Sequence, residues 1–202
     1  MSTRALASAF KENAEIIVGV DTSPEMIAMA RNIMKYQEIQ DIVKKFKISS
    51  NVVSDIQSLI QELQYCLLQP VNQIYTKAMS AKWQMKQLLF AQGNAERVKV
   101  AANSFDLVTI MYAFHEIPKS ARYRILREAR RLLKDGGKLA IVDISTDYCP
   151  SPSMLAGEPY VLEYQQNIMQ QMQSLQGFSN ATNKVVVQGH VHMWELVRCR
   201  RN

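Results

Sequence analysis

A short β-branched run near the start of the sequence constrains the fold more than any other segment. Residues 15–21 read Glu-Ile-Ile-Val-Gly-Val-Asp, a continuous apolar run that ends in an acid. A run that is apolar on both faces is typical of a buried strand in a parallel sheet. Residues 22–25, Thr-Ser-Pro-Glu, have the features of a helix start: a capping serine, a proline for the first turn and an acid that favours the helix dipole. The sequence therefore predicts a β–α unit here.

The same alternation of strand and helix continues along the chain. Further strands are predicted at residues 88–91, 105–111 and 138–143. A helix is predicted from Ala121 to Lys134, closed by residues 135–137 (Asp-Gly-Gly) as a cap and turn. Strands separated by helices of this length favour right-handed βαβ units and a parallel sheet covered on both faces. Residues 184–187 and 191–197 are predicted to form an antiparallel pair at the sheet edge.

Two segments exceed a minimal α/β unit. Residues 35–87 are too long for one crossover, and their apolar residues recur at helical spacing, which predicts an inserted helical hairpin. Residues 160–176 predict a further helix. Because the sequence shows neither an internal repeat nor a disordered linker, we expect residues 1–202 to form a single domain.

The composition is typical of a folded chain, and its charge does not indicate a strongly charged binding partner. Hydrophobic residues make up 48% and charged residues 21% of the sequence, which excludes intrinsic disorder as the main state. The net charge of +6 is mild and dispersed, and the one basic cluster, residues 198–201, has no interleaved aromatic residues. We therefore expect no nucleic-acid partner.

Cysteine usage and hydropathy bear on location. Cys66, Cys149 and Cys199 are far apart, which argues against a disulfide framework and favours a reducing compartment. No apolar run reaches the roughly 20 residues that a transmembrane helix needs, and residues 1–15 lack the apolar region of a secretion signal. The sequence predicts a cytoplasmic protein without a transmembrane segment, or an organellar one if a presequence lies upstream.

Asp21 is the first candidate binding residue. Ligands of parallel α/β sheets bind beyond the carboxyl ends of the strands, and a carboxylate there accepts hydrogen bonds from both hydroxyls of a ribose. The alternative is that Asp21 only caps the helix that follows. Nucleotide sites of this kind also have a glycine-rich turn about 20 residues before the acid, but no two of the 7 glycines form a G-x-G in this sequence.

Five segments together carry a family pattern: VGVDTSPEMIAMA, QGNAE, NSFDLVTIMYAFHEIP, LREARRLLKDGGKLAIVD and GHVHMWELVR. They resemble the class I S-adenosylmethionine-dependent methyltransferases, and most of all the type 11 domain that includes the quinone-biosynthesis C-methyltransferases. The resemblance covers residues 2–30 and 88–148 and, more loosely, 158–198. It implies a Rossmann-like α/β fold with a mostly parallel sheet flanked by helices, strand order 3-2-1-4-5-7-6 and an antiparallel pair at the C-terminal edge.

The resemblance also implies which residues hold the adenosine part of S-adenosylmethionine. Asp21 matches the acid that binds the ribose hydroxyls, and Thr22 and Met26 lie beside it, near the adenine. Asn94 and Ala95 stand where the family has Asp-Ala at the adenine amino group. Asn94 keeps an oxygen that accepts a hydrogen bond but loses the charge.

The remaining implied site residues follow the strand at 105–111. Met111 and Tyr112 end that strand, whose backbone flanks the methionine part of the cofactor in the family. His115, with Glu116 after it, matches the pair that faces the mouth of the active site, so His115 is the candidate base or substrate contact. The alternative is that His115 caps a helix or packs in the core.

Three other polar residues are candidates for chemistry. Asp143 ends a predicted strand, where it either faces the site or caps a turn. His190 and His192 form an H-x-H pair that on a strand lies on one face, but no cysteine or carboxylate stands at a spacing that would complete a metal site. The sequence therefore predicts no bound metal.

The function implied by the resemblance is transfer of a methyl group from S-adenosylmethionine to a small-molecule acceptor. The family's first strand and its G-x-G-x-G loop have no counterpart in this sequence, and residues 2–7 resemble the helix that follows that loop. The alternative is a truncated or non-catalytic remnant of the fold that binds a protein partner through the insertion at 35–87. A nicotinamide-dependent oxidoreductase is disfavoured because its glycine fingerprint is missing as well.

Overall fold

The computed structural model describes residues 9–10, 14–33, 87–179 and 181–200. The chain forms two compact units, Met1–Gln92 and Gly93–Asn202, and each is described by itself. The helical insertion predicted at 35–87 lies outside the described residues except for its last position, and the single domain expected for 1–202 stays a prediction. No helix of the described part is both long and apolar enough to cross a membrane.

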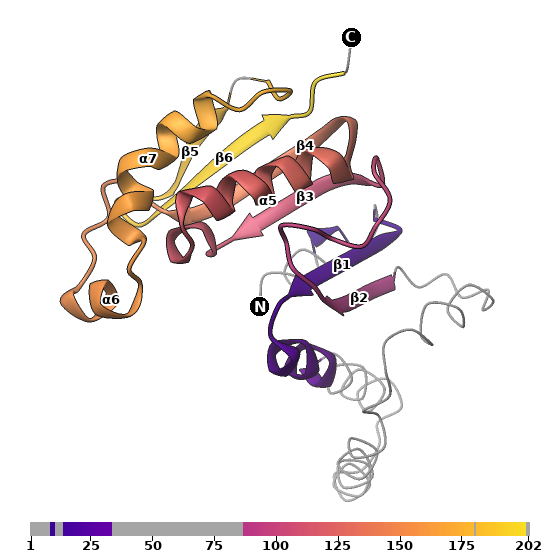
Figure 1. Ribbon diagram of the computed structural model, residues 1–202, viewed down its shortest axis with the longest axis horizontal. Coiled ribbons are helices and arrows are strands. Elements are labelled where there is room, and N and C mark those ends of the chain that lie inside the picture. Colours follow the sequence, from indigo (N-terminus) through magenta and orange to yellow (C-terminus); the bar gives the residue numbers. More distant parts are fainter. Residues whose placement is uncertain (1–8, 11–13, 34–86, 180, 201–202) are drawn as a thin grey trace, which may run out of the picture. The chain divides into compact units, whose positions relative to one another are not determined.

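The first unit contains a pair of parallel strands, β1 (Ile16–Asp21) and β2 (Gln87–Gln92) (Figure 1). The register pairs Ile16 with Gln87 and Asp21 with Gln92, so both strands end at the same edge. The Gln92 side chain donates to the Thr22 carbonyl at 3.1 Å and joins these two ends. The predicted parallel strand is confirmed.

The burial of β1 differs from the prediction of a strand covered on both faces. Only Gly19 is buried, whereas Ile16 is 53% exposed and Val20 38% exposed. Within the described residues, β1 also has a strand partner along one edge only.

A helix over residues 24–33 follows β1, as predicted. The hydroxyl oxygen of Ser23 accepts from the Met26 N–H at 3.1 Å, which satisfies a free donor of the first turn. The same hydroxyl donates to the Glu25 carboxylate at 2.7 Å and lowers the pKa of that exposed carboxyl. Ser23 is therefore the capping residue that the sequence indicated.

The second unit is built on a four-stranded sheet of order β3–β4–β6–β5. Its elements are β3 (Phe105–Met111), the 3₁₀ helix η2 (Phe114–Glu116), α5 (Lys119–Leu132), β4 (Leu133–Ile144), α6 (Pro152–Gly157), α7 (Val161–Gln173), β5 (Thr182–Val187) and β6 (Val191–Val197). β3 and β4 are parallel, whereas β6 runs antiparallel to both β4 and β5. The strand order agrees with part of the implied family order, 3-2-1-4-5-7-6. The pair β2–β1 corresponds to family strands 3-2, and the order β3–β4–β6–β5 corresponds to family strands 4-5-7-6. The missing first strand stays a prediction.

The junction between α5 and β4 corrects the prediction. The helix ends at Leu132, and residues 135–137 lie inside β4 instead of capping the helix. Gly136 adopts a φ of 79° and donates its N–H to the Arg198 carbonyl at 3.0 Å, while the Arg198 N–H donates to Gly137 at 2.9 Å. These backbone groups therefore pair with a distant segment rather than with the last turn of α5. The short helix α6 was not predicted; the Ser151 hydroxyl caps it by accepting from Met154 N–H at 3.2 Å.

One face of the second sheet carries the core. Figure 1 shows α5 and α7 side by side over this sheet, and side chains from both helices share a buried cluster with alternate residues of the strands. The cluster includes, from the strands, Leu139, Ile141, Trp194 and Leu196, and, from the helices, Leu126, Ala129, Tyr164 and Ile168. Asp143 follows Leu139 and Ile141 at the same two-residue alternation, so its side chain also points into the buried face. The buried face of the sheet therefore includes the carboxylate of Asp143 near the carboxyl end of β4.

We expect Leu139→Ala to destabilise the second unit by about 2–5 kcal/mol, because Leu139 is fully buried and its loss leaves a cavity. Urea denaturation followed by near-ultraviolet circular dichroism measures this change. Val186→Ala is the control: Val186 is 54% exposed on β5, and its truncation should change stability by less than about 0.5 kcal/mol. Equal effects of the two substitutions would contradict the described core.

Candidate active site

His115 lies in a short helix, η2, that directly follows β3. Between them Tyr112 adopts a φ of 51°, an uncommon conformation for a non-glycine residue, and its N–H donates to the Val142 carbonyl at 2.9 Å. The chain then turns inward, and Phe114 and His115 are both buried, at 0% and 5% exposure. His115 is thus held at the carboxyl ends of the parallel strands β3 and β4, where α/β folds bind their ligands.

Asp143 anchors the His115 ring. Its carboxylate is fully buried and accepts three hydrogen bonds: from Phe114 N–H at 2.8 Å, from Ile144 N–H at 2.7 Å and from Nδ1 of His115 at 2.5 Å. Because an ionised carboxylate only accepts hydrogen bonds, Nδ1 carries the proton, and Nε2 is left with a lone pair when the ring is neutral. Asp143 thus binds the backbone of the turn, as one of its two predicted roles requires, and it also contacts the candidate residue His115.

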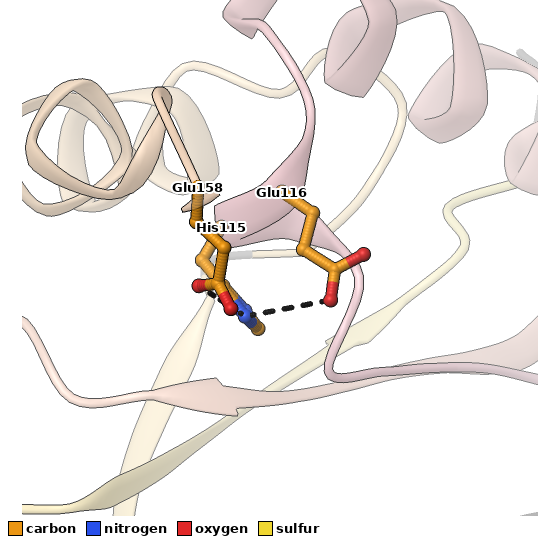
Figure 2. Close-up of side chains that lie close together, drawn as sticks. All are labelled: His115, Glu116 and Glu158. Atoms are coloured by element: carbon orange, nitrogen blue, oxygen red, sulfur yellow. Dashed lines mark ion pairs between the residues drawn. The ribbon is translucent and has the colours of Figure 1, made fainter. Parts of the chain in front are cut away.

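The free edge of the His115 ring faces two carboxylates (Figure 2). Nε2 lies 3.4 Å from Oε2 of Glu158 and 3.8 Å from Oε1 of Glu116. Burial by itself lowers the pKa of His115, but the hydrogen bond and charge of Asp143, together with the charges of Glu158 and Glu116, outweigh it and raise the pKa above its ordinary value. The site therefore favours a positive charge at this edge of the ring.

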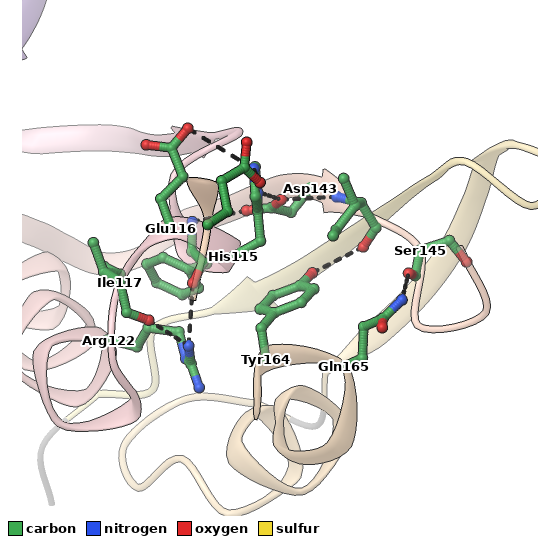
Figure 3. A network of polar contacts seen from close by, with 11 residues as sticks. His115, Glu116, Ile117, Arg122, Asp143, Ser145, Tyr164 and Gln165 are labelled. Atoms are coloured by element: carbon green, nitrogen blue, oxygen red, sulfur yellow. Dashed lines mark hydrogen bonds and ion pairs between the residues drawn. The ribbon is translucent and has the colours of Figure 1, made fainter. Parts of the chain in front are cut away.

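Arg122 and Tyr164 contact the η2 turn and the His115 ring from the helices α5 and α7 (Figure 3). Arg122 is completely buried and donates through Nη1 to the carbonyls of Phe114, at 3.1 Å, and Ile117, at 2.5 Å, which are parts of the η2 turn. The Tyr164 ring meets His115 edge-on at 6.4 Å, and its hydroxyl donates to the Ile144 carbonyl at 3.0 Å. Burial raises the pKa of Tyr164, so this hydroxyl stays a neutral donor. Side chains from α5 and α7 thus hold the His115 turn and ring in place.

Asn94 and Ala95 lie in an exposed turn after β2. Oδ1 of Asn94 already accepts from the Glu96 N–H at 2.8 Å, and the Asn94 carbonyl accepts from the Arg97 N–H at 3.0 Å. An amide oxygen has a second lone pair, so Asn94 retains one acceptor position toward solvent. This free acceptor position is compatible with the predicted contact between Asn94 and adenine, which stays a prediction.

Two residues of α5 anchor the loop that follows this turn. Oε1 of Glu128 accepts from the Val98 N–H at 2.8 Å. Arg131 donates to the carbonyls of Val98, at 2.9 Å, and Val100, at 2.8 Å, and pairs with the Glu128 carboxylate at 2.7 Å. The side-chain hydrogen bond from Arg131 outweighs burial and lowers the pKa of Glu128, and the Val98 N–H adds to it. Glu128 and Arg131 therefore hold the backbone between the candidate adenine turn and β3.

The other predicted cofactor residues are accessible within their own units. Met111 is half-buried at the end of β3, and Tyr112 next to it is 49% exposed. In the first unit Asp21, Thr22 and Met26 are all exposed. No described feature tests their predicted roles, which stay predictions.

Asp21 shows the capping contact that was its alternative role. Its Oδ1 accepts from the Ser23 N–H at 2.9 Å. Among the described residues no donor reaches Oδ2, so one carboxylate oxygen remains accessible to a ligand. Capping and ligand binding are therefore compatible at Asp21.

The two histidines of the H-x-H pair lie in different elements. β6 begins at Val191, so His190 lies in the preceding turn and is exposed, while His192 lies in the strand and is buried. Nε2 of His192 lies 3.2 Å from the Ser145 hydroxyl. The pair does not lie on one face of one strand because His190 precedes the first residue of β6.

Comparison with known proteins identifies the segment that contains η2. Residues 64–141 match the family described as "Methyltransferase domain". The resemblance derived from the sequence is thereby confirmed. A ubiquinone/menaquinone biosynthesis C-methyltransferase of Sinorhizobium fredii is 41% identical over 58 residues, which are 29% of this chain and 22% of that protein. A demethylmenaquinone methyltransferase of Listeria welshimeri is also 41% identical over 58 residues, 29% of this chain and 24% of that protein. This chain therefore matches less than a quarter of the length of these relatives.

Solved structures confirm the fold class. A SAM-dependent methyltransferase from Aquifex aeolicus has a TM-score of 0.50 at 14% identity, covering 96% of this chain and 74% of its own. A structure from Bacillus halodurans also has a TM-score of 0.50, at 16% identity, covering 98% of this chain and 89% of its own. At such low identity these likenesses show the fold alone, which is Rossmann-like with a mostly parallel sheet and an antiparallel edge.

Sequence reasoning found His115 but missed Glu158. Glu158 immediately follows α6, which was itself not predicted, and no motif links it to His115 across 43 positions, the difference between their residue numbers. Asp143 was recognised as the end of a strand, and only the fold showed that its carboxylate meets the imidazole.

We expect Glu128→Gln to destabilise the second unit by about 1–2 kcal/mol at neutral pH, because the charged hydrogen bonds of Arg131 lose their ionised acceptor. The folded-state pKa of Glu128 lies below its ordinary value of 4.5, so this stabilisation is present above that value and is lost as the pH falls through the lowered pKa. Urea denaturation at neutral and at successively lower pH measures the difference between wild type and variant. Asp106→Asn, which removes a carboxylate whose side chain is 83% exposed, is the control; a pH-independent deficit for Glu128→Gln would exclude this explanation.

Proposed function

We propose that this chain binds S-adenosylmethionine and transfers its methyl group to a small-molecule acceptor, with His115 on the acceptor side. The observation that carries the proposal is the buried His115–Asp143 pair at the carboxyl ends of β3 and β4. His115 belongs to the segment that matches the methyltransferase domain, and Asp143 lies two residues beyond its end. The relatives named above support the class of reaction.

The residues proposed for the cofactor are chemically suited to its adenosine part. Oδ2 of Asp21 is an unengaged anionic acceptor for a ribose hydroxyl within the described residues, because the capping bond uses only Oδ1. Asn94 retains one acceptor lone pair for an adenine amino group. Thr22, Met26, Met111 and Tyr112 are assigned to the cofactor by family resemblance.

When bound, S-adenosylmethionine supplies an electrophilic methyl group on a sulfonium, which leaves as S-adenosylhomocysteine after transfer. The chain's own contribution is to position the acceptor and remove its proton. Asp143 holds the Nδ1–H of His115 and fixes the ring, so that the Nε2 lone pair is directed toward Glu116 and Glu158. Nε2 takes the proton that the acceptor atom loses as its bond to the methyl carbon forms. The raised pKa of His115 makes Nε2 a stronger base than a free imidazole.

The finer predictions remain part of this proposal. A small molecule is the proposed acceptor, and no nucleic-acid partner is expected from the dispersed charge. A cytoplasmic location rests on the scattered cysteines. A protein partner at the insertion, which belongs to the non-catalytic alternative, lies outside the described residues.

We expect the purified chain to bind S-adenosylhomocysteine in calorimetry and Asp21→Ala to weaken this binding by at least about tenfold, because a charge-assisted hydrogen bond to the ribose contributes about 1.5–3 kcal/mol. Glu25→Gln is the matched control, since Glu25 is an exposed acid of the same helix start. The control should bind like the wild type.

Two outcomes would count against the methyltransferase proposal. No binding at millimolar S-adenosylhomocysteine would favour the non-catalytic alternative. Binding that Asp21→Ala leaves unchanged would remove Asp21 from the cofactor site. Circular dichroism of each variant establishes that the comparison is made between folded proteins.

A further inference from the structure

Three potential metal ligands converge at the free edge of the His115 ring (Figure 2). One nitrogen of His115 and one carboxylate oxygen each from Glu116 and Glu158 lie within 4.8 Å of one another. The first two residues come from η2, and the third comes from the residue that follows α6. The fold therefore assembles this group from two separate segments.

The spacing of these atoms suits a single ion. Zinc binds imidazole nitrogen and carboxylate oxygen at about 2.0–2.2 Å, so two ligands at tetrahedral positions are separated by about 3.4 Å. Nε2 of His115 lies 3.4 Å from Oε2 of Glu158 and 3.8 Å from Oε1 of Glu116. The two carboxylate oxygens lie within 4.8 Å of each other, and Glu116, whose side chain is 57% exposed, can move inward to close the set around an ion.

The group includes one buried carboxylate oxygen without a hydrogen-bond donor. Oε2 of Glu158 is buried and accepts no hydrogen bond from the described residues. The His115 side chain is only 6% exposed, and its Nε2 faces the two glutamates while Asp143 lies on the other side of the ring. When the ring is neutral, the Nε2 lone pair and the carboxylate oxygens repel one another, and a cation at their centre would satisfy all three.

The surroundings of His115 also match those of a metal-bound histidine. Such a histidine usually donates its second ring N–H to a carboxylate or carbonyl, which fixes the ring and increases its basicity. The Nδ1–Asp143 contact of 2.5 Å provides this support from a fully buried residue. Tyr164 meets the ring from the side at 6.4 Å and further limits its rotation.

We propose that His115, Glu116 and Glu158 bind one divalent transition-metal ion, with Zn²⁺ as the best match to one imidazole and two carboxylates. Two glutamate charges neutralise the ion, and Asp143 acts through His115 as a positioning residue. Three protein ligands leave a fourth position open on the side of the exposed Glu116, where a water or an oxygen of a small molecule binds.

The proposed metal site does not rest on methyl transfer, because cation binding needs neither the cofactor nor an acceptor. It does place a limit on His115: the Nε2 lone pair holds either the ion or a proton, not both at once. With the ion bound, activation of an acceptor oxygen passes from the imidazole to the metal.

The test is calorimetric titration of the chelator-treated, dialysed full chain with ZnCl₂, repeated with MnCl₂ and MgCl₂. We expect one Zn²⁺ per chain, weaker Mn²⁺ binding, and a loss of affinity of at least about tenfold in Glu158→Gln and Glu116→Gln. Asp143→Asn should weaken Zn²⁺ binding about 10–100-fold if it folds. The two glutamate variants keep the test decisive if it does not.

Matched controls exclude other zinc ligands on the chain. His190→Ala removes an exposed histidine and Glu195→Gln a carboxylate paired with Lys138 and Lys184, and both should bind Zn²⁺ like the wild type. Combined Cys149→Ser and Cys199→Ser, which removes the two exposed thiols of the described part, should also leave binding unchanged. Absence of binding at millimolar Zn²⁺, or binding that Glu158→Gln does not weaken, would overturn the proposal.

Discussion

The arrangement around His115 depends on one buried carboxylate. Asp143 accepts hydrogen bonds from two backbone N–H groups and from the imidazole, and it thereby ties the end of β4 to the turn after β3. Without it, each of these buried donors would be left unpaired, at a cost of about 1–3 kcal/mol per group. A single side chain thus links the stability of the sheet edge to the orientation of the ring.

The two edges of the His115 ring have different surroundings and different uses. The Nδ1 edge is enclosed by the backbone of the turn and by Asp143, whereas the Nε2 edge meets the side chains of Glu116 and Glu158. Arg122 holds the carbonyls of the same turn from the core side. The fixed edge orients the ring, and both proposals, proton transfer and metal binding, use the Nε2 edge.

The sequence predicted most of the framework because periodic apolar patterns report local structure. β3 was found with its observed bounds, and the hairpin strands near 184–197 were found to within two residues. The bounds failed at residues 134–137, where backbone groups pair with Arg198 across the fold. No local pattern contains that information, because the two segments are about 60 residues apart in the sequence.

The candidate site was predictable only in part, for the same reason. His115 was found because its neighbours form a family motif, whereas its contact with Asp143 depends on the register of β3 against β4. Glu158 carries no motif at all, and its place beside the ring follows from the loop and short helix α6 between β4 and α7. A residue within a family motif can be found from the sequence. A residue that only the tertiary fold brings to the site can be found only from the structure.

The strand order of the second unit determines how its sheet is completed. β6 is the last strand in the sequence, yet it lies between β4 and β5. During synthesis β5 therefore emerges before β6, its strand partner among the described residues, and the buried face of β4 lacks Trp194 and Leu196 until β6 has been made. Among the described strands of this unit, β3 and β4 can pair without β6 but β5 cannot, so the four-stranded sheet forms only after β6 has been made.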